Sequence, residues 1–368
     1  MKNIYLIISC CAVLISQSCA TDFDLTADWQ EITVVYGLLN PADTAHYIKI
    51  NKAFLSEDQS AVDIAQIADS LYHEAPISVV LEEYEVDTDQ DDGKLLNANF
   101  IQEIPLTKIN AADVGVEKEE GDFATSPYFL YTTNYQLKPD FDTNSGVDSY
   151  FNYELKIITH RGNEVKAETP IIGDFSVQHP NPELSLSWLA DTYSMRWKAV
   201  PHATIYDIDV YINFDEEKVN DNGTITTERI NLKWNLVSNL KEKDHIESNN
   251  RVVYTFSTDA FYSYMAQRLS DNLDKVEKRY FDDLTFVIHA ASEPLQIFNE
   301  VTQAQFSVSA TQSISTYTNV TGGLGLIATR HSKTVPEIEF NIQTIDRLAC
   351  DEVTKHLKFE TSSGNPCN

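Results

Sequence analysis

Positive charge is scarce in this chain of 368 residues. Lysine and arginine together number 27 against 56 aspartates and glutamates, which gives a formal net charge of −29. Such a balance repels polyphosphate, so nucleic-acid binding is excluded as a class of function. It also disfavours docking on anionic lipid head groups, so any attachment to a membrane has to come from something other than basic patches.

Common catalytic motifs are also missing. The nine histidines include no pair with metal-binding spacing, and the HExxH arrangement of metalloproteases is absent. There is no G-x-S-x-G nucleophile elbow, and TGGLG at 321–325 lacks the GK[ST] ending of a phosphate loop. We therefore expect a protein that is not an enzyme. Gly322, Gly323 and Gly325 instead predict a tight loop with positive φ, which is one candidate binding loop.

Cysteines are few, and their positions divide them into two groups. Cys10, Cys11 and Cys19 fall within or directly behind an N-terminal apolar run, whereas Cys350 and Cys367 lie near the C-terminus. An even pair in an exported protein predicts a disulfide that pins the tail. Two free thiols are the alternative. A metal site is disfavoured there, because only one histidine lies nearby and structural zinc takes four ligands.

The N-terminal apolar run has the layout of a lipoprotein signal peptide. Lys2 supplies a positive charge, Ile4–Ser16 is too short to span a bilayer, and the small Ser18 precedes Cys19. We expect cleavage after residue 18 and a covalent lipid on Cys19. Such a lipid anchors the chain to a membrane surface without crossing it. An ordinary secretory signal with incidental cysteines is the alternative.

Alternation of apolar and polar residues with period two dominates the remaining chain and predicts a mostly β protein. ITVVYGLLN, with Ile32, Val34 and Tyr36, and AHYIKINKAFL are two such strands about a turn at Pro41. SAVDIAQIADSLYHE and TDAFYSYMAQRLSDNLDKV have helical spacing instead, and Thr258 caps the second. We predict two immunoglobulin- or fibronectin-like β-sandwich domains with short helical insertions.

The stretch QHPNPELS is rich in proline and polar breakers and marks the predicted boundary between the two domains. The length of the chain also favours two domains. The predicted organisation is a signal peptide at 1–18, a lipidated tether at 19–29, an N-terminal β-sandwich domain at 30–177, a fibronectin-like domain with a helical insertion at 183–310, and a C-terminal glycine loop, strand and helix pinned by the disulfide at 311–368.

Aromatic and small residues follow a recognisable order directly after that boundary. In residues 184–214, Trp197 falls on an early strand, Pro201 and Ala203 fall in a turn, and Tyr206 falls on the next strand. This order resembles the start of a fibronectin type III domain. The resemblance implies that Trp197 and Tyr206 pack in a sandwich core, and it covers only this segment.

The lipid cysteine is accompanied by stretches that occur together in a known family. These are the strand pair at 34–41 and 48–54, Pro294, and the segment at 317–325 with its YTNVTGG run. In these features the chain resembles a family of uncharacterised Bacteroidota outer-membrane lipoproteins that carry a domain of unknown function. Acidic residues after Cys19 resemble the export signal for the outer leaflet. Because members often lie beside TonB-dependent receptors, the resemblance implies a surface-exposed accessory protein with an outer-membrane protein partner.

Two further stretches are candidate binding sites. Asp87, Asp89 and Asp91 alternate as oxygen ligands do in calcium loops, but the later loop positions depart from an EF-hand, so a solvated hairpin turn is favoured over calcium. Aromatic residues form 11% of the chain, and Tyr128 and Tyr131 could line a sugar-stacking surface, although core packing is favoured. We predict a binding protein without a cofactor, whose partner is an outer-membrane protein or, alternatively, a glycan.

Overall fold

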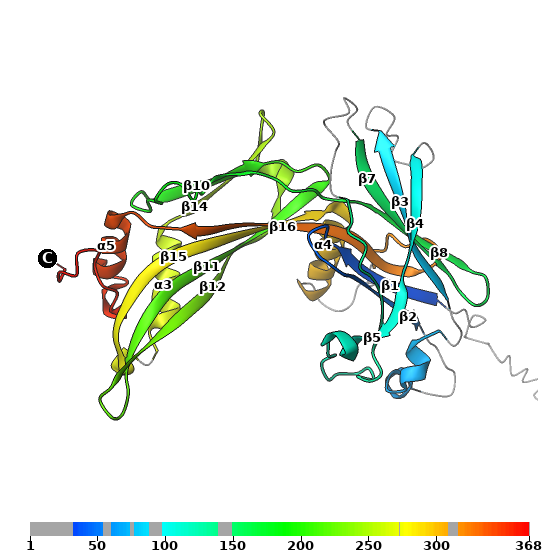
Figure 1. The fold of residues 1–368 in the computed structure, drawn as a ribbon, viewed down its shortest axis with the longest axis horizontal. Coiled ribbons are helices and arrows are strands. Elements are labelled where there is room, and N and C mark those ends of the chain that lie inside the picture. Colours follow the sequence, from blue (N-terminus) through cyan, green and yellow to red (C-terminus); the bar gives the residue numbers. More distant parts are fainter. Residues whose placement is uncertain are drawn as a thin grey trace, which may run out of the picture.

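The computed structural model describes residues 32–53, 60–73, 77–87, 98–138, 149–271, 273–307 and 316–367. Within these ranges the chain forms three β-sheets and a few short helices, which confirms the predicted mostly β class. Figure 1 shows two lobes set at an angle, so that the described chain has the outline of an arch. Cys19, Asp89 and Asp91 lie outside the described residues, so the lipidation and calcium predictions stay predictions.

The strands and helices follow the chain in this order. The strands are β1 (Ile32–Leu39), β2 (His46–Ala53), β3 (Ser78–Asp87), β4 (Asn99–Pro105), β5 (Thr107–Asn110), β6 (Phe129–Thr133), β7 (Ser149–Ile158), β8 (Glu164–Pro170), β9 (Val177–His179), β10 (Thr192–Lys198), β11 (Ala203–Val219), β12 (Ile225–Lys241), β13 (Ile246–Glu247), β14 (Arg251–Ser257), β15 (Val276–Ser292) and β16 (Leu324–Ile338). The helices are α2 (Ala61–Ala65), α3 (Asp259–Leu269), α4 (Glu293–Ser307) and α5 (Ile342–Cys350), and short 3-10 turns include η1 (Ala68–Leu71) and η4 (Ala111–Val114).

One eight-stranded sheet runs through both lobes, in the order β12-β11-β15-β16-β1-β2-β6-β5, and is called the large sheet below. Strand β16 joins its two halves. Leu324–Thr329 pairs in parallel with β1, and Arg330–Ile338 pairs antiparallel with β15. The other two sheets are β4-β3-β7-β8 and β13-β14-β10-β9. Because one sheet serves both lobes, the division into two domains stays a prediction.

Each lobe has its own apolar core on one face of the large sheet. In the N-terminal lobe, β3, β4, β7 and β8 cover β1, β2 and the first half of β16. The core between them includes Val35, Ile48, Leu81, Leu155 and Ile327, all at most 1% exposed. This packing of two sheets face to face is sandwich-like, as the alternation of apolar residues predicts.

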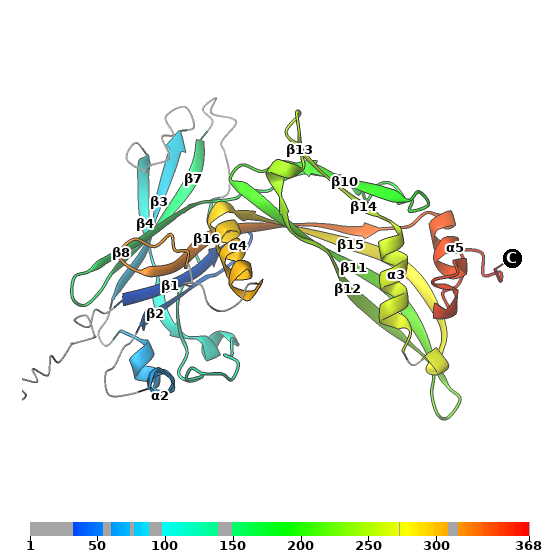
Figure 2. The same ribbon diagram turned by 180° about the vertical axis from the view of Figure 1, so that it is seen from behind.

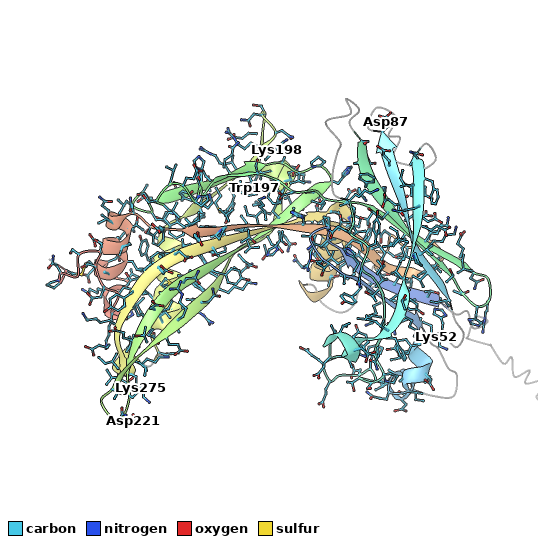
Figure 3. The ribbon with its side chains drawn as sticks, viewed as in Figure 1. Lys52, Asp87, Trp197, Lys198, Asp221 and Lys275 are labelled. Carbon is cyan, nitrogen blue, oxygen red and sulfur yellow. A yellow bond between two sulfur atoms is a disulfide. The ribbon has the colours of Figure 1, made fainter. Side chains whose placement is uncertain are left out.

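Aromatic rings fill the core of the other lobe. Trp188 and Trp197 are both fully buried there, which confirms the expected burial of Trp197 in the core. The ring of Trp197 on β10 meets the ring of Tyr206 on β11 edge-on, with centroids 5.2 Å apart, as the fibronectin resemblance implies. Figure 3 labels Trp197 together with its neighbour Lys198, whose side chain is exposed because successive residues of a strand point to opposite faces.

The helix predicted in SAVDIAQIADSLYHE is broken in the structure. It forms α2 and the 3-10 turn η1, because Ile67 has an extended backbone with φ −95° and ψ 105°. The carbonyl oxygens of Ile64 and Ile67 accept the backbone amides of Ile67 and Ser70 at the break, and the Ser70 hydroxyl lies within hydrogen-bond distance of both, at 2.7 and 2.6 Å.

The C-terminal tail is pinned by a disulfide between Cys350 and Cys367, which confirms the predicted pair. Cys350 ends α5, and Cys367 lies 17 residues further along the chain. The start of α5 is fixed as well, since the side chain of Asn341 accepts a hydrogen bond from the amide of Thr344 at 2.9 Å. Figure 2 shows α5 and the C-terminus at the end of the molecule that is remote from β1.

A buried carboxylate lies among the strands of the N-terminal lobe. The Glu83 side chain is 0% exposed and accepts hydrogen bonds from Lys138 Nζ at 2.5 Å, Tyr135 Oη at 2.6 Å and Gln102 Nε2 at 3.3 Å. Burial alone would raise the pKa of Glu83, but these donors outweigh it and hold the pKa below its ordinary value. The ionised carboxylate therefore stabilises this lobe.

We expect Glu83→Gln to lower the free energy of unfolding at pH 7 by about 2 kcal/mol, since the donors lose a charged acceptor. A depressed folded-state pKa contributes stability that is complete above the ordinary glutamate pKa near 4.5 and is lost as pH falls through the lower folded value. Urea unfolding from pH 7 downward should thus show the gap between wild type and variant shrinking below about pH 4.5. The exposed Glu103→Gln is the control, and an equal gap for both variants would contradict this account.

Candidate functional site

A groove of about 540 Å³ lies on the outer face of the large sheet, the face turned away from the core of the N-terminal lobe. Its lining comes from β1, β2 and β16, from α4 on one side, and from residues 116–130 on the other. Figures 1 and 2 place α4 against β16 at the junction of the two lobes. The lining residues are Tyr36, Gly37, Leu38, Asp43, Ala45, His46, Tyr47, Lys49, Val116, Tyr128, Leu130, Leu295, Leu326 and Arg330.

Strand alternation explains why this face carries large side chains. On β1, Val35 and Leu39 point into the core and are 0% exposed, whereas Tyr36 points outward and is 42% exposed. In the sheet register Tyr36 lies opposite Lys49 of β2 on one side and Leu326 of β16 on the other. These three side chains therefore stand in one row across the floor of the groove.

Aromatic rings form the walls. Tyr47 on β2 is 37% exposed, and Tyr128, directly before β6, is half-buried. The ring of Tyr36 contacts Phe298 of α4 edge-on, with centroids 6.4 Å apart. Burial raises the pKa of Tyr128. Between the rings lie aliphatic side chains, namely Leu38, Val116, Leu130, Leu295 and Leu326.

Cations accompany this apolar surface. Lys49 Nζ lies 5.8 Å from the centroid of the Tyr128 ring, and burial lowers the pKa of Lys49. Burial first, and then the charge of Lys49, lower the pKa of Lys118, which lies two residues beyond the lining residue Val116. Arg330 lines the groove with an exposed side chain. The acidic residue of the lining, Asp43, accepts a hydrogen bond from Asn40 Nδ2 at 2.8 Å.

A second hollow of about 430 Å³ adjoins the groove and shares Leu38, Leu295 and Arg330 with it. Its polar centre is the buried Asp209 carboxylate, which lies 2.9 Å from Lys233 Nζ and 3.3 Å from His289 Nε2. Burial would raise the pKa of Asp209, but hydrogen bonds from its neighbours hold the pKa below its ordinary value. This carboxylate is therefore already paired.

Ser332, His289 and Asp209 form a row on neighbouring strands, with Ser332 Oγ 2.7 Å from His289 Nδ1. These are the residue types of a nucleophilic triad. Ser332, however, lies within the extended strand β16, without the sharp strand-to-helix turn that exposes a catalytic serine and supplies oxyanion donors. We interpret the row as a polar network that pairs side chains on the sheet face.

The glycines predicted as a binding loop serve close packing. Gly322 has the positive φ expected for a tight loop, +75°, whereas Gly325, with φ +122°, lies within strand β16, and Gly323 has no positive φ. A Cβ at Gly322 would lie 2.4 Å from the carbonyl oxygen of Glu164, and one at Gly323 would lie 2.6 Å from that of Thr33. These contacts explain the glycines without a ligand, and a binding role for the loop stays a prediction.

The other candidates are separated by the fold. Tyr131 lies in the N-terminal core, whereas Tyr128 lines the groove. Asp87 ends β3, and its predicted calcium partners fall outside the described residues. Among the described residues, no cluster of three or more histidines, cysteines or carboxylates is arranged to hold a metal ion. No helix in the described part of the chain has the length and apolar character needed to cross a membrane.

Comparisons with known proteins add little to this picture. No protein-family model matches the chain, and no curated protein sequence matches it. Among solved structures, it is similar to the C-terminal globular domain of oligosaccharyltransferase from Pyrococcus abyssi, at 11% sequence identity and a TM-score of 0.21. The match covers 69% of this chain and 45% of that one, so this chain spans less than half of that domain. A likeness at this TM-score supports no conclusion about function.

Proposed function

We propose that this protein is a lipid-anchored surface protein of the outer membrane that binds a partner without catalysis, as an accessory component of a receptor or assembly. The observation that carries the proposal is the groove on the outer face of the large sheet. Large exposed side chains gather there on a rigid sheet, next to a helix. The surroundings of Cys19 support the anchor, because an apolar run too short to span a bilayer ends directly before it.

The composition of the groove favours a protein as its partner. Contiguous exposed apolar surface is uncommon on soluble monomers and marks interaction sites. Interface cores are enriched in tyrosine and other aromatic residues and in arginine, with charged residues otherwise depleted. The groove places Tyr36, Tyr47, Tyr128 and Arg330 around five aliphatic side chains, with Lys49 and Asp43 as its other charged lining residues.

A glycan is the second candidate. Carbohydrates stack on exposed aromatic rings, and Tyr36 and Tyr47 are both more than a third exposed. The adjoining hollow offers side-chain amides and carboxylates, including Asn235 and Asn299, that could bond sugar hydroxyls. The aliphatic lining between the rings counts against this candidate, because it gives hydroxyl groups no hydrogen-bond partners.

An affinity pull-down tests the proposal. The tagged, lipidated protein is recovered from mildly solubilised native membranes and its companions are quantified by mass spectrometry. We expect one outer-membrane protein at near-equal amount, and a loss of about tenfold or more in the Tyr36→Ala variant, because truncating a central aromatic anchor costs about 2 kcal/mol or more. Tyr280→Ala, at a tyrosine of similar exposure on β15, is the matched control and should retain the companion.

Two outcomes would count against the proposal. One is a clean preparation with no stoichiometric companion. The other is a companion that Tyr36→Ala and Tyr280→Ala retain equally, which would place the contact elsewhere. In either case the purified protein goes to glycan binding assays, where a ligand lost in Tyr36→Ala would establish the second candidate.

A further inference from the structure

We propose that the groove recognises an acidic peptide segment of the partner, in which a carboxylate meets Lys49 and an adjacent aromatic or aliphatic side chain enters between the tyrosines. This inference rests on the proposed function and names the chemistry of its partner. It is carried by two cations, Lys49 and Arg330, that line the groove of a strongly acidic protein among mostly apolar and aromatic side chains.

Many cations of this chain form ion pairs, because carboxylates outnumber them by two to one. On the same outer face, Lys233 lies 2.9 Å from Asp209. Lys49, Lys118 and Arg330 form no ion pair within the described residues, as is also true of Lys198, but Lys49 and Arg330 line an apolar groove. Lys118 donates instead to a backbone carbonyl, that of Ala124, at 2.8 Å. The ammonium of Lys49 and the guanidinium of Arg330 are therefore available to a negatively charged ligand at the groove.

The position of Lys49 makes it the centre of recognition. It stands beside Tyr36 in the cross-strand row on the groove floor, with Tyr128 on its other side. Burial lowers the pKa of Lys49. A carboxylate that binds there would make a charge-assisted hydrogen bond and favour the charged form of Lys49. Asp43, the acidic residue of the lining, is held by Asn40.

An extended peptide suits the groove better than a small anion or a sugar. A free anion would gain nothing from the five aliphatic side chains, and a sugar would leave its hydroxyl groups unpaired against them. A peptide supplies both parts in neighbouring residues, a carboxylate for Lys49 and an apolar side chain for the space near Leu295 and Leu326.

The test is selection from a displayed library of random 12-residue peptides on the purified full-length protein. We expect selected peptides to carry Asp or Glu next to an aromatic or aliphatic residue. Individual peptides should bind Lys49→Met at least about tenfold more weakly, because a hydrogen bond between charged groups is lost. Lys49→Glu should lose the acidic preference altogether. Lys198→Met, at an exposed lysine on β10, is the matched control and should bind as wild type does.

The outcomes separate this inference from the proposed function. Peptides that require Tyr36 but show no acidic preference, or that bind Lys49→Met undiminished, would overturn the inference and leave the groove as a partner site. If the selection yields no peptide whose binding requires Tyr36, both the inference and the proposed function are overturned. In that case, binding of polygalacturonate or its neutral methyl ester would identify a glycan site. Thermal unfolding of each variant shows that it is folded before binding is compared.

Discussion

Replacing Gly325 with alanine should separate the two halves of the large sheet. Gly325 faces Val35 in the parallel pairing of β16 with β1, and an added Cβ would lie 1.8 Å from the Val35 carbonyl oxygen. Its φ of +122° is also a conformation that an alanine rarely adopts. Since the obstacle is backbone and not a flexible side chain, the strands have to part. We expect a loss of about 3 kcal/mol or more, from overpacking together with backbone strain.

Two other glycines separate the causes. Gly162 has φ +81° with open space around its Cβ position, so Gly162→Ala reports backbone strain alone and should cost about 1 kcal/mol. Gly121 has open space and an ordinary φ, so Gly121→Ala should be close to neutral. Urea unfolding of the three variants checks the order. A Gly325→Ala protein as stable as Gly162→Ala would show that β1 and β16 do not approach as closely as described.

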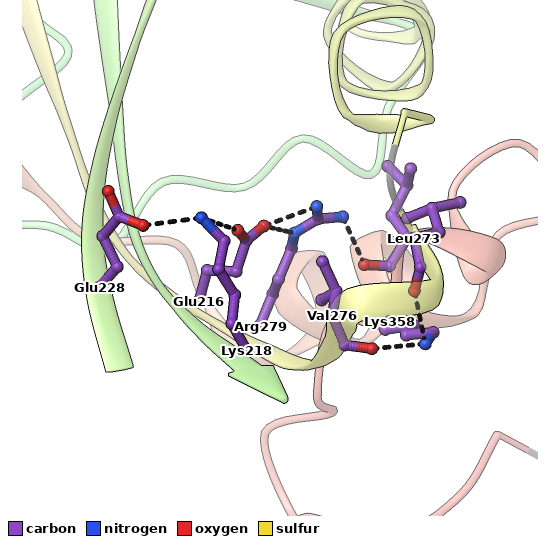
Figure 4. A network of polar contacts seen from close by, with 8 residues as sticks. Glu216, Lys218, Glu228, Leu273, Val276, Arg279 and Lys358 are labelled. Carbon is purple, nitrogen blue, oxygen red and sulfur yellow. Dashed lines mark hydrogen bonds and ion pairs between the residues drawn. The ribbon is translucent and has the colours of Figure 1, made fainter. Parts of the chain in front are cut away.

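Arg279→Met should destabilise the C-terminal lobe by about 3 kcal/mol, because the buried Glu216 carboxylate then keeps only Lys218, at 3.2 Å, as a charged partner. The side chains of Arg279 and Glu216 are only 3% and 8% exposed, with nitrogen and oxygen 2.6 Å apart. Figure 4 shows the pair among its neighbours. Arg279 also donates from Nη1 to the carbonyl oxygen of Leu357 at 2.8 Å, and its backbone exchanges hydrogen bonds with Lys358 and Glu360. The tail after α5 should therefore loosen as well.

The double variant Glu216→Leu/Arg279→Met removes both charges and should recover most of the loss, because a buried pair contributes less than its breakage costs. The exposed Arg229 is the control. It pairs with Asp215 and Asp282 near the solvent, and Arg229→Met should cost about 1 kcal/mol or less. Thermal unfolding, with proteolysis of the tail as a second readout, checks both statements. Equal effects of Arg279→Met and Arg229→Met would show that burial does not matter here.

Local sequence patterns were sufficient for the class of fold and for parts of the core. Period two indicated the strands, and the order of Trp197 and Tyr206 implied that both side chains pack in the core. The C-terminal disulfide followed from the number and position of the cysteines. The strands depend on residues that are close in the chain, so local alternation is enough to predict them. The disulfide involves a single pair of cysteines, so their number and position are enough to predict it.

The groove could not be predicted, because β1 is apolar on both faces. Ile32, Val34 and Tyr36 alternate as a core-facing set would, yet the structure turns Thr33, Val35 and Leu39 inward and leaves Tyr36 exposed. Which set faces the core depends on the strands that pair with β1, and its pairing with β16 has no local signal. Only the position of α4 and β16 then shows that the outward set lines a groove.

Because the first described strand, β1, pairs with the last, β16, the large sheet cannot be completed until nearly the whole chain is available. Val34 lies opposite Leu324, some 290 residues later in the chain. Until β16 has been synthesised and delivered, β1 has β2 on one side and an edge of unpaired amides and carbonyls on the other. Closing so long a loop is slow, and an open edge invites pairing with other chains. Protein truncated before residue 324 should therefore keep this edge of β1 unpaired. We expect it to aggregate more readily than the full-length chain.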